Sequence, residues 1–261
     1  MLILLSPSKA LDYSVPLPAA VARKASEPLF TAQAAELIEG LRQKSPAQVA
    51  RLMDLSDKLA LLNVGRYAAW QPEATADNSL PAVWAFDGDV YDGLQARALK
   101  AADLAWAQQH LVILSGLYGA LRPLDRLQPY RLEMGTAVAT ERGRNLYDFW
   151  GDRIAEHLNR LQRGERAPRV VNLASQEYSR AALRPALKAR VIECVFEEGQ
   201  GAGRYRIVSF FAKKARGAMA RFVIRHRIQM PEALREFDED GYAFASAVST
   251  ADRLVFRRQA M

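Results

Sequence analysis

The sequence opens with MLILLSPSK over residues 1–9, and this stretch gives the first indication of the fold. Four consecutive apolar residues, Leu2–Leu5, are followed at once by Ser6 and Pro7 and then by Lys9. A short apolar run that is bounded by turn residues is typical of a buried strand. We therefore expect Leu2–Leu5 to be a strand inside a sheet, with a polar loop at its carboxyl end.

Similar β-rich runs recur along the chain, with amphipathic helical patterns between them. Besides Leu2–Leu5, the expected strands are Val83–Phe86, Leu111–Ser115, Val170–Ala174, Val191–Phe196, Tyr205–Phe211 and Leu254–Arg257. The expected helices are Ala32–Arg42, Pro46–Asp54, Asp57–Trp70, Asp103–His110, Leu146–Leu161 and Lys213–Met230. This alternation favours a mixed α/β (α+β) fold in a single domain over residues 1–261, with helices flanking a central mixed sheet. Gly199–Gly203, between two expected strands, is predicted to be a hairpin loop.

Four of the apolar runs end in a hydroxyl or amide residue and continue into a polar loop. Ligands of α/β proteins bind beyond the carboxyl ends of strands, so neighbouring strands would bring these loops together. The side chains that would then face one cleft are Ser6, Lys9, Ser115, Tyr118, Ser175, Glu177 and Lys213. The alternative interpretation is that serine and glycine only end the strands and begin turns.

The positive charge of the chain is concentrated in one segment. The net charge is +7, from 36 Lys and Arg against 29 Asp and Glu, yet residues 204–230 alone carry +8 and no acid, which leaves −1 for the remainder. These basic residues are Arg204, Arg206, Lys213, Lys214, Arg216, Arg221, Arg225 and Arg227. An anionic partner would experience this local density within a Debye length of about 8–10 Å.

The helix expected over Lys213–Met230 would carry an apolar stripe between two basic margins. One interpretation is that these cations bind phosphates and release their counterions. The other is that they are solvated or pair with acids from elsewhere in the chain, because the helix itself offers no acid at i±4.

Residues 45–60 predict two short helices joined by a tight turn. Ser45, Pro46 and Gln48 form a capping-box pattern at the first helix, and Ser56 is placed to cap the second. Such a pair resembles a helix-hairpin-helix, which holds phosphate with backbone N–H groups at helix starts and reads no bases. The usual hairpin glycine is missing, so a plain αα-hairpin is the alternative.

The remaining polar motifs indicate neither a metal nor a cofactor. Asp87, Asp89 and Asp92 lack the spacing and the closing Glu of a calcium loop. The three histidines are scattered, and a single cysteine excludes a disulfide scaffold and a Cys-based zinc site. That residue, Cys194, lies in an alternating strand pattern, so we expect it to be buried and inert rather than a redox sensor.

Several of these motifs together resemble the YaaA family of peroxide stress proteins, almost from end to end. They are Leu4–Lys9, Ser56–Ala60, Gly88–Tyr91, Ser115–Asp125, Pro129–Met134, Asn172–Tyr178 and Phe211–Arg221. One departure is Ser179, which follows Tyr178 where an aromatic residue is common. The resemblance implies a cytosolic protein that limits free intracellular iron and hydroxyl-radical damage. It also implies one domain of unusual α/β fold, in which a positive cleft and a helix-hairpin-helix-like element bind DNA.

The first functional hypothesis is therefore a non-enzymatic, cytoplasmic stress protein that binds double-stranded DNA through its phosphates with little sequence preference. The residues expected to hold phosphates are Lys9, Lys58, Lys213, Lys214, Arg216, Arg221 and Arg225. Because the sequence shows no obvious iron ligands, any effect on free iron would be indirect.

The second hypothesis is an enzyme that acts on a nucleotide or nucleic acid, with a small anionic ligand in the cleft. The candidate residues are Lys9 and Lys213 for the anion, Glu177 or Asp89 as general base, and Tyr118 and Arg131 for orientation. Arg131 and Glu133 lie at i and i+2 of an extended segment and so on one face, which suits either an ion pair or a ligand site.

The apolar start of the sequence is too short for a membrane span, which needs about 20 apolar residues, and it has no basic region before it. We therefore expect neither a targeting segment nor a membrane partner.

Overall fold

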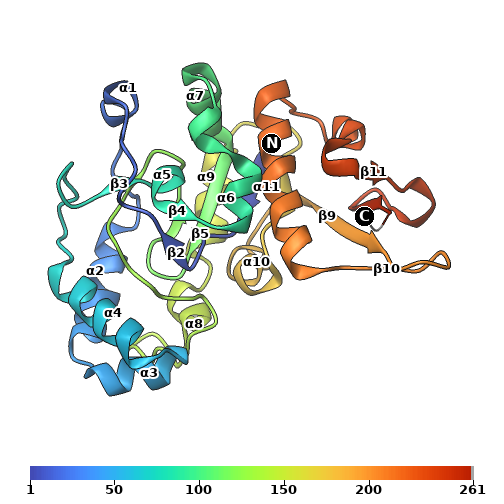
Figure 1. Ribbon diagram of the computed structural model, residues 1–261. Coiled ribbons are helices and arrows are strands. Elements are labelled where there is room, and N and C mark those ends of the chain that lie inside the picture. Colours follow the sequence, from blue (N-terminus) through green and yellow to red (C-terminus); the bar gives the residue numbers. More distant parts are fainter. Residues whose placement is uncertain (260–261) are drawn as a thin grey trace.

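The computed structural model describes residues 1–259, and Leu2–Leu5 forms the predicted strand, β1. β1 pairs in parallel with β5 (Leu111–Ser115) on one side and with β8 (Arg169–Leu173) on the other. Every β1 residue is buried, because helices cover both faces of the sheet at this point (Figure 1). The first apolar run of the sequence is thus an interior strand around which the fold is built.

The large sheet is mixed, as predicted. Its strand order is β11-β12-β9-β8-β1-β5-β6, and β9 (Arg190–Gly199) and β12 (Arg253–Arg258) extend the parallel part beyond β8. Antiparallel strands finish it: β6 (Gly119–Leu121) pairs with β5, β11 (Ala243–Phe244) with β12, and β10 (Tyr205–Arg206) with β9. The five parallel strands therefore end at one edge. The β9–β10 connection confirms the predicted hairpin loop at Gly199–Gly203.

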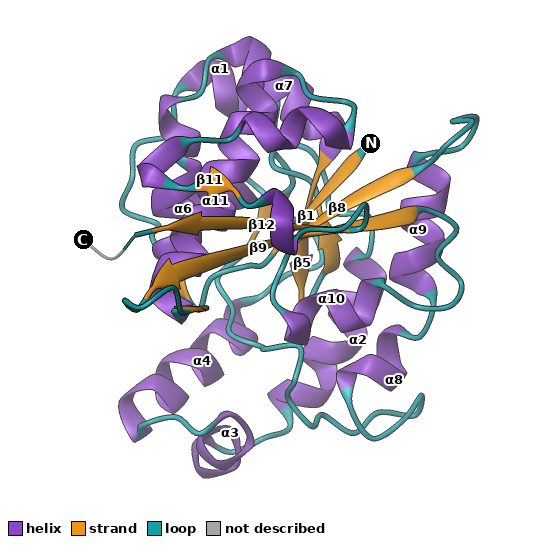
Figure 2. Ribbon diagram, turned by 90° about the vertical axis from the view of Figure 1, so that its right-hand side faces the viewer, coloured by secondary structure: helices purple, strands orange, loops and turns teal. Residues whose placement is uncertain are grey.

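Helices lie on both sides of this sheet (Figure 2). On one side are α6 (Asp89–Leu94), α7 (Ala101–His110) and α11 (Ser209–His226), and on the other are α2 (Thr31–Arg42), α8 (Leu146–Trp150) and α10 (Gln176–Ala182), with α9 (Arg153–Leu161) beside α10. The smaller elements are α1 (Ala19–Ala22), α5 (Ala82–Ala85), the pair β2 (Ala10–Leu11) and β4 (Phe86–Asp87), and the pair β3 (Leu80–Pro81) and β7 (Arg126–Leu127). Four short 3₁₀ helices complete the set: Ala96–Ala98, Pro231–Glu236, Glu239–Gly241 and Ser246–Val248.

Helices α6 and α11 touch backbone to backbone at two glycines. A Cβ atom on Gly217 of α11 would lie 1.8 Å from the carbonyl oxygen of Val90, and one on Gly93 of α6 would lie 2.0 Å from that of Lys214. Only glycine, which has no Cβ atom, allows the two helix backbones to approach so closely. The contact fixes the start of α6 beside the first turns of α11.

A buried ion pair joins the parallel strands β9 and β12 near their carboxyl ends. Arg258 donates from Nε to Glu198 Oε2 at 2.7 Å, and the Tyr242 hydroxyl donates to the other oxygen of the same carboxylate. The Arg258 guanidinium also lies over the rings of Tyr242 and Phe211. Phe211 belongs to the first turn of α11, so this cluster ties that turn to the sheet.

The predicted pair of short helices is present as α3 (Pro46–Met53) and α4 (Asp57–Ala69), at the periphery of the molecule (Figures 1 and 2). The capping box is formed, with Ser45 N donating to Gln48 Oε1 at 2.8 Å and Gln48 N donating to Ser45 Oγ at 3.4 Å. Asp54 adopts the left-handed conformation, with φ of 51°, at the turn where a glycine is usual. An αα-hairpin with a non-glycine turn is therefore the observed structure.

Four expected elements are wrong in part. The helix expected over Lys213–Met230 ends at His226, because Arg227 takes a left-handed conformation with φ of 53°. Val83–Phe86 was expected to be a strand but is mostly the short helix α5. A run of four apolar residues that is buried on all sides shows no periodicity by which a helix could be told from a strand. Tyr205–Phe211 is a strand only over β10, and Ser209 already begins α11. Leu146–Leu161 is divided into α8 and α9 at Gly151, whose φ of 50° ends the first helix.

Among residues 1–259, no helix has both the length and the apolar character needed to cross a membrane. The predicted domain runs to Met261, and its last two residues lie outside the described part of the chain.

Candidate functional site

A cavity of about 590 Å³ opens at the carboxyl ends of β1 and β8. We call it the cleft. It is formed by four segments that are far apart in the sequence: Ser6–Ala10 after β1, Asp87–Val90 at the start of α6, Ser175–Tyr178 at the start of α10, and residues 207–216 at the start of α11. Parallel pairing explains why the loops after β1 and β8 meet, because adjacent parallel strands deliver their following loops to the same edge of a sheet. The other two segments lie together because α6 packs closely on α11.

Two serines join the loops that follow β1 and β8. Ser175 N donates a hydrogen bond to Ser6 Oγ at 2.8 Å, and the two hydroxyls lie 3.4 Å apart. The Tyr91 hydroxyl of α6 donates to the carbonyl oxygen of Ser6 at 3.2 Å. The floor of the cleft is therefore a connected hydrogen-bonded unit.

Four of the predicted site residues meet in this cleft: Lys9, Asp89, Glu177 and Lys213. Lys213 Nζ lies 3.7 Å from Asp89 Oδ2, which pairs the first turn of α11 with the first residue of α6. Glu177 Oε1 accepts from the backbone N–H of Gly135 at 2.9 Å. Of the side chains that were predicted to converge at the strand ends, Ser6, Lys9, Ser175, Glu177 and Lys213 line the cleft.

Arg216, which was predicted as a phosphate ligand and also lines the cleft, differs from the other two cations there. Its side chain is half-buried, and within residues 1–259 it has neither an ion pair nor a hydrogen-bond partner. Burial lowers the pKa of its guanidinium, an effect that Cys194 and Glu193 oppose. A partly desolvated cation that forms no ion pair is unfavourable, and an incoming anion would relieve that cost.

Glu133 connects the cleft to Arg131. This connection was not predicted. Lys9 Nζ lies 2.8 Å from Glu133 Oε2, and Arg131 binds Oε1 of the same carboxylate at 3.0 Å. Arg131 and Glu133 were predicted to lie on one face of an extended segment, and they form an ion pair there. Arg131 itself does not line the cleft but lies one contact behind Lys9.

Ser115 and Tyr118 do not face the cleft, and this part of the prediction is wrong. Tyr118 is buried, and its hydroxyl accepts from Trp70 Nε1 at 2.9 Å and from Gln128 N at 3.3 Å. Burial raises the pKa of the Tyr118 phenol to about 12. Ser115 is buried against the Tyr130 hydroxyl at 2.7 Å. After β5 the chain turns back immediately into antiparallel β6, which directs this loop away from the cleft.

Acids from elsewhere in the chain engage half of the basic segment. The pairs are Lys213 with Asp89, Lys214 with Asp240 at 3.8 Å, Arg221 with Glu239, and Arg227 with Asp103 at 2.7 Å. Arg221 also donates to the carbonyl oxygen of Gly93 at 2.7 Å, so it fastens α11 to α6. Lys214 and Arg221 therefore pair with acids outside the cleft, and neither of them lines it.

The other two predicted phosphate ligands also lie apart from the cleft. Arg225 is exposed near the far end of α11, about 14 Å of helix rise beyond Arg216. Lys58 lines a separate cavity beside α4. Of the seven predicted cations, only Lys9, Lys213 and Arg216 meet at one place.

Within residues 1–259 no group of three or more His, Cys, Asp or Glu side chains is arranged to hold a metal ion. Cys194 is buried in β9, as predicted, and burial raises the pKa of its thiol to about 12. A buried thiol of this kind is protonated at neutral pH and poorly reactive.

Comparison with known proteins gives consistent results over the whole chain. A family model described as peroxide stress protein YaaA matches residues 1–248. A UPF0246 protein of Leptothrix cholodnii is 63% identical over 258 residues, which cover 99% of this chain and 98% of that protein. UPF0246 proteins of Paracidovorax citrulli (59% identical) and Bordetella avium (56% identical) each match over 259 residues and 99% of both chains.

Proposed function

The chain belongs to the peroxide stress protein YaaA family, and from that premise we propose that it acts in peroxide stress by binding DNA through the phosphate backbone at the cleft. Arg216 carries this proposal, because it is a half-buried guanidinium without an acid partner among residues 1–259. Charge-assisted hydrogen bonds from arginine to phosphate are among the strongest polar contacts in proteins. A lower level of free iron would follow indirectly.

Two further cations can support such a contact. Lys9 and Lys213 lie in the same cleft, and each is about half exposed or more, so each can turn from its acid toward a phosphate. Arg204 and Arg206 are exposed in the segment that leads into α11. None of these side chains requires a particular base, which fits binding without sequence preference.

The test is the salt dependence of duplex DNA binding, measured by fluorescence anisotropy. We expect Arg216→Gln to weaken binding about tenfold or more and to reduce the slope of log K against log salt by about one, because one phosphate contact is lost. Arg190→Gln is the matched control, since Arg190 lies at the opposite, amino-terminal edge of the sheet and pairs with Asp252. Equal affinity and equal slope for wild type and Arg216→Gln would refute the proposal.

An enzyme acting on a nucleotide or nucleic acid is the second candidate. The observation that favours it is the presence of three carboxylates, Asp87, Asp89 and Glu177, in the same cleft as the cations. Binding a polyanion gains nothing from acids, whereas general-base catalysis requires one. Tyr118 and Arg131 have no direct part in this candidate, because neither lines the cleft.

Glu177→Gln separates the two candidates. The substitution keeps an oxygen that can accept from Gly135 N–H and removes the basic carboxylate. If the cleft is catalytic, the variant should fail to restore peroxide resistance to a deletion strain while its DNA affinity stays within about twofold of wild type. Full resistance with Glu177→Gln would rule out Glu177 as the base, and Glu232→Gln, on an exposed 3₁₀ helix, serves as the control.

A further inference from the structure

A second cavity, of about 670 Å³, lies beside α4 and shares no lining residue with the cleft. We call it the α4 groove. One wall is a single face of α4, with spacings i, i+3, i+4, i+7, i+8 and i+11. Its residues are Lys58, Leu61, Leu62, Gly65, Arg66 and Ala69.

Between its two cations, Lys58 and Arg66, this face of α4 is apolar although it points away from the protein core. Leu61 is 64% exposed and Leu62 is 48% exposed. The core-facing side of the same helix is formed by Ala60, Asn63 and Tyr67, all of them buried. An outward helix face is normally polar, so an apolar face that lines a concave cavity indicates a ligand rather than solvent.

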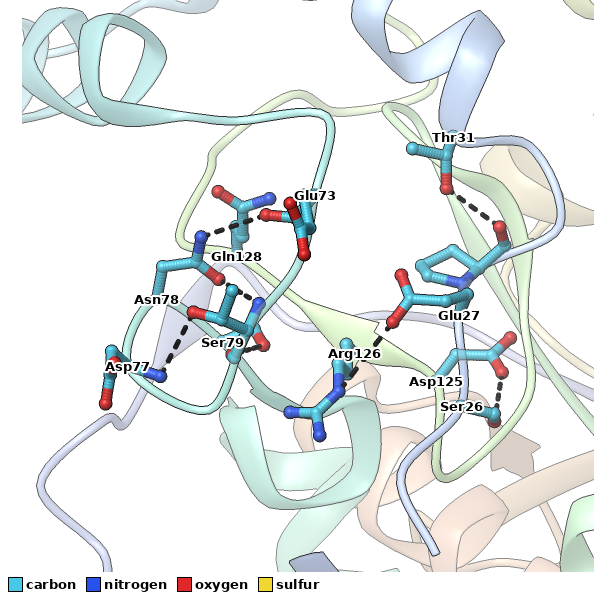
Figure 3. Close-up of polar contacts among 12 residues, drawn as sticks. Ser26, Glu27, Thr31, Glu73, Asp77, Asn78, Ser79, Asp125, Arg126 and Gln128 are labelled. Atoms are coloured by element: carbon cyan, nitrogen blue, oxygen red, sulfur yellow. Dashed lines mark hydrogen bonds and ion pairs between the residues drawn. The ribbon is translucent and has the colours of Figure 1, made fainter.

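The opposite wall of the groove is already formed. It includes Tyr13, Asn78 and Pro129, and the loop that carries Asn78 is held by its own hydrogen bonds (Figure 3). Asn78 Oδ1 accepts from Thr75 N at 2.8 Å, and Asn78 Nδ2 donates to the Glu73 carbonyl oxygen at 3.1 Å. The volume of about 670 Å³ lies within the range of small-molecule sites, about 300–1,000 Å³, so the groove fits a small molecule.

Arg66 determines the charge of the occupant. Its side chain is half-buried in the groove, and its polar contact within the described chain is to Asn63 Oδ1 at 3.2 Å, with no acid partner. Burial lowers the pKa of this guanidinium, an effect that Tyr13 and Tyr67 oppose and Arg131 adds to. Lys58 adds a second cation, while the one acid of the lining, Asp77, is exposed in the loop of the opposite wall.

We propose that the α4 groove binds a small amphipathic anion, namely an aliphatic or aromatic carboxylate. The apolar body lies against Leu61 and Leu62, and the carboxylate pairs with Arg66. The site is distinct from the cleft, so this inference is independent of DNA binding.

Gly65 offers a variant that fills the groove without removing a contact. Gly65 lines the cavity, and a Cβ atom built on it has no neighbour within 4 Å. Leucine at this position would occupy the space of the ligand and would also favour the helix. Gly40 of α2 has equally open surroundings, so Gly40→Leu is the matched control outside the groove.

The test is a calorimetric titration of the full-length protein with octanoate, and with 1-octanol as the neutral analogue. We expect octanoate to bind at least tenfold more tightly than octanol, because only the anion pairs with Arg66. Gly65→Leu should abolish octanoate binding, Arg66→Gln should weaken it about tenfold, and Gly40→Leu should leave it unchanged. No octanoate binding by wild type, equal binding of octanol, or wild-type binding by Gly65→Leu would each overturn the proposal.

Discussion

Replacing Gly217 with alanine is expected to lower the free energy of unfolding by about 3 kcal/mol or more, at the upper end of the range for overpacked cores. The new methyl group would lie 1.8 Å from the Val90 carbonyl oxygen and 2.7 Å from Leu94 N. These are main-chain atoms of α6, which cannot rotate aside as a side chain would. Helices α6 and α11 must therefore separate, and the contact between Asp89 and Lys213 across the cleft should be lost with them.

Urea denaturation of Gly217→Ala beside Gly40→Ala measures this effect. Both glycines are helical, but a Cβ atom on Gly40 meets nothing within 4 Å. The control should gain about 0.5–1 kcal/mol, because alanine favours a helix more than glycine does. A Gly217→Ala protein as stable as wild type would show that α6 and α11 do not approach as closely as described.

Removing Arg258 is expected to cost about 3–5 kcal/mol of stability, the usual effect of leaving one buried charge without its partner. The side chains of Arg258 and Glu198 are only 7% and 6% exposed, so water cannot replace the lost ion pair. In Arg258→Met the Glu198 carboxylate would retain only the Tyr242 hydroxyl as a partner within this cluster. The first turn of α11 would also lose the guanidinium that lies over Phe211.

Two comparisons make this prediction specific. The double variant Arg258→Met/Glu198→Gln should recover part of the loss, because it no longer buries an unpaired charge. Arg190→Ala removes the exposed ion pair with Asp252 and should cost about 1 kcal/mol at most. Both variants are measured in the same denaturation experiment. If Arg258→Met lowers the free energy of unfolding no more than Arg190→Ala does, the ion pair of Arg258 does not have the stabilising effect of a buried pair.

The strands of the large sheet were the elements best predicted from the sequence. The runs that became β1, β5, β8, β9 and β12 were predicted from their apolar character, and their parallel pairing brought Lys9 and Glu177 to one edge. Helices α6 and α10 were missed, because six or seven residues beginning directly after a loop show too little periodicity.

Side-chain partners that come from distant segments could not be predicted from the sequence. The basic segment shows no local acids, yet Asp89, Asp103, Glu239 and Asp240 come from other elements to meet it. Tyr118 follows β5 as Ser175 follows β8, but Gly119, with φ of 65°, turns the chain back at that point. Contacts of this kind depend on the tertiary arrangement of segments that are distant in the sequence.

The borders of the large sheet bear on how molecules of this protein behave beside one another. The strand order ends at β11 and β6, which are two and three residues long and antiparallel to their neighbours. Long, flat outer strands template the addition of strands from other molecules and so promote aggregation. Here the long parallel strands are all interior, and a neighbouring chain in a crowded solution finds only a few free backbone groups to pair with.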